Sequence, residues 1–144
     1  MSEAALNQTV TPYLSVKGAA AAIEFYKQAF GAGERYRIPG PDGKIVHAEL
    51  FIGSSLVYLA DEFESEDFFS PITRGGTTVL FAMEVPDADA AFQRAVDAGA
   101  TVQRAMRDEP YGRTGDVTDP FGHRWSIMTV NPNFKPEDMM GGSP

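Results

Sequence analysis

The hydrophobic pattern of this chain occurs twice. Residues 16–23 line up with residues 85–92, and in both places an apolar run precedes an alanine-rich stretch with helical spacing. Each stretch ends at a glycine, Gly31 or Gly99, and glycine takes the positive φ of a helix C-cap at low cost. The pattern therefore predicts two equivalent helices, the second of which has Asp87 as its N-cap.

Segments of strand character surround each helix. One strand is predicted before each helix and three after it, which makes the fold α+β with two βαβββ modules. We predict a single domain over 1–144, with a first module at 10–62, a linker at 63–76, a second module at 77–130 and a flexible tail at 131–144. Two curved sheets of this kind are expected to surround a central cavity. The predicted strands are 10–16, 34–38, 44–52, 56–61, 77–85, 101–107, 116–118 and 123–130.

Composition narrows the classes of partner. The formal charge of −8 argues against nucleic acid and anionic membrane surfaces, both of which favour Lys and Arg. The absence of cysteine excludes disulfides, thiolate nucleophiles and Cys-based zinc sites. No apolar run approaches a membrane span, and no basic segment with an apolar stretch opens the chain. We expect a cytoplasmic protein.

The pair His47 and Glu49 is the first candidate for chemistry. Residues two apart on a strand project from the same face, and the alternate positions here are apolar. The pair is interpreted either as a catalytic acid/base site, with His47 titrating near neutrality, or as a structural ion pair or dimer contact. A two-residue turn at Gly53-Ser54 would place Glu49 opposite Tyr58, whereas a three-residue turn would reverse that pairing.

The last predicted strand contributes further polar residues. Alternation sends Arg124 and Ser126 toward the cavity and Trp125 toward the core. His123, beside a turn, is interpreted as a structural hydrogen-bonding residue. Tyr13, on the first strand, is expected to face the cavity with Tyr58 as part of the ligand-binding set.

Two loops complete the candidate set. Tyr111 and Arg113 lie in the glycine-flanked segment 111–115, which is interpreted as a loop that closes over a ligand. Arg113 would offer a planar fork to a carboxylate or phosphate there, or it pairs on the surface with one of the many acids. The acidic run 61–67 is typical of a solvated loop.

Several segments together resemble a known family. The chain is similar over residues 10–130 to the PhnB-like branch of the glyoxalase/bleomycin-resistance/dioxygenase superfamily, also called vicinal oxygen chelate proteins. That resemblance implies the βαβββ fold and no single activity, because members include lyases, dioxygenases, epimerases, thiol transferases and antibiotic-binding proteins. The segments are 12–16 (PYLSV), 21–26 (AAIEFY), 47–50 (HAEL), 111–113 (YGR) and 119–125 (DPFGHRW).

The resemblance also implies where a metal would be bound. Metal-dependent members carry His or Glu on the first and last strands of each module. The matching positions here are Thr11, Tyr58 (or Val57), Leu80 and Ser126, none of which is a good ligand for a divalent cation. We therefore expect no metal at these positions and no cofactor.

Three functions remain open. The first is a binding protein for a small planar or anionic molecule. The second is an enzyme that uses His47 and Glu49 as acid and base or as ligands of a relocated metal. The third is a dimeric interaction module. The unsuitable ligand positions favour the first, and exposed edge strands lead us to expect a homodimer.

Overall fold

The computed structural model describes residues 7–140 and confirms the α+β fold with two βαβββ modules. The first module forms a four-stranded sheet in the order β1-β4-β3-β2, called sheet 1, and the second forms sheet 2 in the order β5-β8-β7-β6. Sheet 1 and its helix comprise β1 (Tyr13–Val16), α2 (Ala19–Phe30), β2 (Gly33–Pro39), β3 (Ile45–Ile52) and β4 (Ser55–Asp61). Sheet 2 and its helix comprise β5 (Leu80–Glu84), α4 (Ala88–Ala98), β6 (Thr101–Glu109), β7 (Gly112–Thr118) and β8 (Arg124–Val130).

Shorter elements lie between and after the modules. The linker contains the 3₁₀ helix η2 (Glu64–Glu66) and the single-turn helix α3 (Pro71–Arg74), while η1 (Pro41–Gly43) joins β2 to β3. The segment predicted as a flexible tail contains η3 (Pro136–Met139), and its last four residues lie outside the described part of the chain. None of the helices within residues 7–140 is long and apolar enough to cross a membrane.

The helix ends follow the sequence pattern. Gly31 and Gly99 have φ angles of 67° and 127°, as predicted for glycines at helix C-caps. Asp87 caps α4 by accepting a hydrogen bond from the backbone N–H of Ala90 at 3.1 Å. The N-terminus of α2 is instead held by Asp61, whose Oδ1 accepts from the N–H groups of Gly18 and Ala19, both at 3.0 Å.

The strand register depends on a tight turn. Strand β3 ends at Ile52 and β4 begins at Ser55, so the turn has two residues and Glu49 lies opposite Tyr58. In β8 the residues Trp125 and Ile127 are buried in the core, as alternation predicted. Each sheet thus packs one face on its helix and leaves the other uncovered by it. We call the second face the open face.

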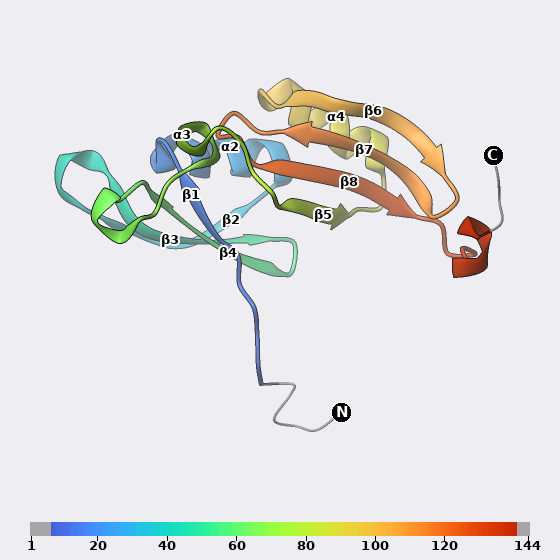
Figure 1. Cartoon of the computed structure of the whole chain (residues 1–144), viewed down its shortest axis with the longest axis horizontal. Helices are drawn as coiled ribbons and strands as arrows, with labels where there is room; N and C mark the ends of the chain where they lie inside the picture. Colours follow the sequence, from blue (N-terminus) through green and yellow to red (C-terminus); the bar gives the residue numbers. More distant parts are fainter. Residues whose placement is uncertain (1–6, 141–144) are drawn as a thin grey trace.

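The two modules share one core but not one sheet. Helices α2 and α4 pack together, and buried Asp119 accepts hydrogen bonds from Tyr26 of the first module and Trp125 of the second. Nε2 of His123 hydrogen-bonds the backbone oxygen of Ser15 at 2.9 Å, as the interpretation of a structural histidine predicted. The sheets lie in opposite halves of the molecule (Figure 1), and β1 and β5 each pair on one side within the described chain.

Candidate functional site

A chain of hydrogen bonds crosses the open face of sheet 1. The Tyr13 hydroxyl lies 2.6 Å from Nδ1 of His47, and Nε2 of the same ring lies 2.8 Å from Oε2 of Glu49. The Tyr36 hydroxyl donates to the same carboxylate oxygen at 2.8 Å, and the Arg35 guanidinium lies 3.3 Å from the other oxygen. Strands β1, β2 and β3 therefore bring a phenol, an imidazole and a carboxylate into one line.

The protonation states within this chain follow from its geometry. The hydrogen bond from His47 is the main factor that lowers the pKa of Glu49, so the carboxylate is ionised and only accepts. Nε2 of His47 lies against this carboxylate, so we assign the donated hydrogen to Nε2 and let Nδ1 accept from the Tyr13 hydroxyl. Burial, and then the charge of Glu49, raise the pKa of Tyr13, which keeps the phenol protonated. Its oxygen retains lone pairs for a donor on a ligand.

Aromatic rings surround the Tyr13 end of this chain. The ring centroids of Tyr58, Phe68 and His47 lie 5.5, 5.2 and 5.3 Å from that of Tyr13, all in edge-to-face contact. Tyr13 is nevertheless 45% exposed, so part of its surface is free to contact another planar group. Sheet 1 thus brings together four of the predicted site residues: Tyr13, His47, Glu49 and Tyr58.

The predicted residues of β8 lie on the open face of sheet 2. The Ser126 hydroxyl is 3.2 Å from that of buried Thr114. Asp116, opposite Ser126 in the β7–β8 register, is 4% exposed, and its Oδ1 has no hydrogen-bond partner within residues 7–140. Nε of Arg124 and Nη1 of Arg107 are likewise buried and unpartnered within that range. This face holds charged groups that are not matched to one another.

The prediction of a loop at 111–115 is wrong, because residues 112–115 belong to strand β7, which begins at Gly112. Arg113 faces neighbouring acids, with Nη2 3.0 Å from Asp89 and Nη1 3.3 Å from Asp108. This is the surface pairing that the sequence left as an alternative. Tyr111 precedes the strand and contacts Phe134, with ring centroids 6.4 Å apart. The described structure does not bring either residue to the hydrogen-bonded chain on sheet 1.

Sequence reasoning missed Arg35 and Tyr36. The segment was predicted as a strand, but the β2–β3 register shifts between Glu34 and Tyr36, so that a bulge directs both neighbouring side chains at Glu49. Asp116 was also missed as a site residue. It stands at the start of the predicted strand 116–118, but residues 112–116 (GRTGD) do not alternate apolar and polar side chains, so no signal in the sequence indicated the face on which it lies.

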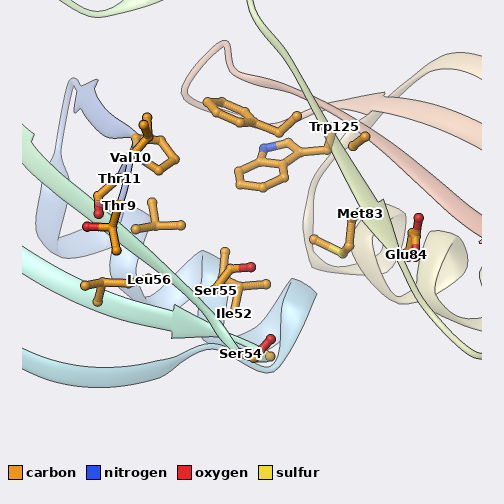
Figure 2. A pocket seen from close by; sticks show the side chains of 15 residues that line it. Thr9, Val10, Thr11, Ile52, Ser54, Ser55, Leu56, Met83, Glu84 and Trp125 are labelled. Atoms are coloured by element: carbon orange, nitrogen blue, oxygen red, sulfur yellow. The ribbon is translucent and has the colours of Figure 1, made fainter. Parts of the chain in front are cut away.

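A pocket between the modules does not coincide with this chemistry. It has a volume of about 900 Å³. Figure 2 shows Thr11 and Leu56 on one side and Met83 and Trp125 on the other. Glu84 is the charged residue in its lining, and the predicted binding residues do not contribute to it. We therefore place the candidate site on the open faces of the sheets.

The metal positions of the resemblance do not form a ligand set. Thr11 lines the inter-module pocket, whereas Tyr58 is in the aromatic cluster of sheet 1. On sheet 2, Leu80 pairs with Arg124, and Ser126 pairs with Ala82. Within residues 7–140 no three His, Cys, Asp or Glu side chains are grouped closely enough to hold a metal ion. An aliphatic side chain and neutral hydroxyls do not suit a divalent cation.

This chain is similar to known proteins in both sequence and fold. The family model described as Glyoxalase/Bleomycin resistance protein/Dioxygenase superfamily matches residues 5–127. An uncharacterized protein of Mycobacterium bovis is 48% identical over 122 residues, which are 82% of this chain and 80% of that protein. A solved structure from Arabidopsis thaliana is 30% identical with a TM-score of 0.66, covering 84% of this chain and 98% of that one.

A more distant structure shows the fold alone. The fosfomycin resistance protein FosX from Listeria monocytogenes, in complex with Mn(II) and sulfate, has a TM-score of 0.70 at 15% identity. The match covers 92% of this chain and 98% of that one. A βαβββ pair with one helix per sheet thus recurs where the sequence has diverged almost completely.

Proposed function

Because this chain belongs to the glyoxalase/bleomycin resistance protein/dioxygenase superfamily, we propose that it binds a small planar or anionic molecule on the open face of sheet 1. We place it in the PhnB-like branch and propose that binding needs none of the usual metal positions. The observation that carries the proposal is the hydrogen-bonded chain from Tyr13 to Glu49, which ends at a half-exposed aromatic ring.

The groups at the Tyr13 end of this hydrogen-bonded chain indicate what kind of ligand would bind. A planar ring would contact the exposed faces of Tyr13 and Tyr58, and a donor on the ligand would meet the free lone pair of the Tyr13 oxygen. The anionic part would be recognised by Arg124, a cation on the open face of sheet 2 whose Nε has no partner within residues 7–140. Planar and anionic features of one ligand would then engage the two sheets.

A homodimer would bring the two faces together, and we propose one. Tyr13 on β1 and Leu80 on β5 are 45% and 46% exposed, and Val79 beside β5 is 50% exposed. Strands β1 and β5 are edge strands in the described chain, and edges with exposed apolar residues favour pairing with another copy. Sheet 2 of one copy would then complete the site on sheet 1 of the other.

A second candidate function is proton transfer. The order phenol, imidazole, carboxylate allows Tyr13 to accept a proton from an acidic group of a substrate while its own proton passes to Nδ1 of His47. Glu49 would stabilise the imidazolium that forms, and the substrate would be left as an anion. In this candidate Tyr13 contacts the substrate, and His47 and Glu49 act through it.

The proposed function is tested with two carboxylates of different shape. We expect 2-naphthoate, which is planar, to bind more tightly than cyclohexanecarboxylate in titration calorimetry. Arg124→Met removes one ligand contact, and His47→Ala removes the group that positions the Tyr13 hydroxyl. Each should weaken naphthoate binding by about tenfold, which corresponds to about 1.4 kcal/mol. Arg113→Met is the matched control, since this arginine is engaged by acids.

The outcome that contradicts the proposal is equal affinity for the two carboxylates, or naphthoate binding that survives both substitutions. Thermal denaturation of each variant separates a lost contact from a lost fold. Light scattering on wild type and Leu80→Lys tests the dimer: we expect a dimer for the former and a monomer for the latter. A monomeric wild type at micromolar concentration would refute the shared site.

A further inference from the structure

A separate pocket lies beside the linker. It has a volume of about 480 Å³ and is lined by three aromatic rings, from Tyr13, Phe63 and Phe68, together with the carboxylate residue Glu66. Its remaining wall is small or aliphatic, formed by Val46, Ala60 and Ser65. No basic side chain lines this pocket.

The linker holds two of these rings in place. Phe63 and Phe68 form an antiparallel bridge, with backbone N–H to oxygen distances of 3.0 and 3.1 Å in the two directions. Residues directly opposite in such a bridge project from the same side. The ring of Phe68 also contacts that of Tyr13 at 5.2 Å, so the linker is fastened to β1.

Several acids of the run 61–67 are engaged within the protein, unlike those of a simple solvated loop. Asp61 holds the start of α2, Glu62 accepts hydrogen bonds from Ser70, and Asp67 lies 2.7 Å from Arg74. The side chains of Glu64 and Glu66 make no hydrogen bond or ion pair with any residue in 7–140. Of these two, Glu66 lines the pocket and Glu64 does not.

We infer that this pocket binds an organic cation such as a substituted ammonium group. An ammonium group is attracted to the faces of aromatic rings and to a carboxylate, and three rings with one unpaired carboxylate provide both. The overall charge of −8 favours the approach of a cation as well. The pocket adjoins the proposed planar-ligand site through Tyr13 but depends on Phe63, Phe68 and Glu66, which that site does not use.

The test uses two probes of equal shape and different charge. Choline and its neutral isostere 3,3-dimethyl-1-butanol are titrated into the full chain, with binding followed by the NMR shifts of the backbone amides of residues 63–68. We expect choline to bind with an affinity at least about fivefold higher than its isostere, as expected for a cation–π and charge contribution. Equal affinities, or no binding of choline, would overturn the inference.

Two glutamine variants provide a matched pair. Glu66→Gln should lower choline affinity toward that of the isostere, whereas Glu64→Gln, with the same change of charge in the same 3₁₀ helix, should leave it unchanged. If both variants weaken choline binding equally, the attraction is a general effect of surface charge and the proposed site is wrong. Phe68→Leu should weaken choline by about two- to fivefold, and its thermal denaturation checks the fold. Naphthoate and the His47 and Arg124 variants play no part, so either proposal can fail alone.

Discussion

The open faces of the two sheets differ in how their buried carboxylates are satisfied. On sheet 1 the carboxylate of Glu49 accepts from His47 and Tyr36, so its charge is matched by neighbours on the same sheet. On sheet 2 the equally buried Asp116 has one carboxylate oxygen without a hydrogen-bond partner, and Nε of Arg124 also has none, within residues 7–140. The first face is preorganised, and the second gains most from a group that arrives from outside.

The modules also anchor their helices by different means. In the first, one side chain, Asp61, accepts hydrogen bonds from the backbone N–H groups of Gly18, Ala19 and Ile45. In the second, the Thr129 hydroxyl accepts from the N–H of Ala88 and donates to a backbone oxygen. The same junction is therefore held by a carboxyl group in one module and by a hydroxyl in the other.

The largest expected effect on stability comes from removing the side chains that anchor the two helices. Asp61→Ala leaves three N–H groups without their acceptor and should lower the free energy of unfolding by about 3 kcal/mol, whereas Thr129→Val should cost about 1 kcal/mol. Urea denaturation of both variants measures the difference. Equal losses would mean that the two junctions are equivalent despite their chemistry.

A smaller effect sharpens the contrast between the open faces. Glu49→Gln should lower the urea midpoint at pH 7, because the hydrogen bond from His47 lowers the pKa of Glu49 in the folded state. A carboxyl with a lowered pKa stabilises the fold above its usual value of 4.5, and this contribution is lost as the pH falls through the lowered pKa. The difference between variant and wild type should therefore shrink in acid.

The matched change on sheet 2 is Asp116→Asn. One carboxylate oxygen of Asp116 has no partner within residues 7–140. Replacing the carboxylate by an amide should therefore leave the urea midpoint unchanged or raise it. The same urea titrations at pH 7 and in acid compare the two variants. A loss as large as that of Glu49→Gln would show that the two faces are equally well matched.

The smallest expected effect is that of Arg113→Met on stability. Its partners Asp89 and Asp108 are exposed, and surface ion pairs contribute little. Thermal denaturation should show no resolved change in midpoint. A clear fall in the thermal midpoint would contradict this expectation and would indicate that the ion pairs of Arg113 stabilise this end of β7.

The sequence predicted those features of the fold that depend on neighbouring residues, such as helix ends, a tight turn and the buried face of a strand. Gly31 and Gly99 gave the helix ends, and of the two turn lengths left open after β3, the two-residue turn at Gly53-Ser54 is the one found, with Glu49 opposite Tyr58. Alternation also predicted the buried face of β8. These features depend on residues close together in sequence.

Prediction failed where a residue's role depends on a distant neighbour. Gly112 suggested a loop, yet a Cβ there would meet the backbone oxygen of Thr129 at 2.2 Å, so the glycine permits close approach of two strands. Gly115 similarly lies beneath Phe92 of α4. The contribution of Tyr36 required a bulge that no turn residue marks.

The bonds between the modules carry a consequence for how the chain reaches its native state. Tyr26 and Asp119 are separated by 93 residues, and Ser15 and His123 by 108. Such distant pairings are formed only after long loops close, which slows folding relative to proteins with local contacts. Each of the two similar modules thus depends on the other: each buries polar groups of the other, and neither half expressed alone should acquire a stable structure.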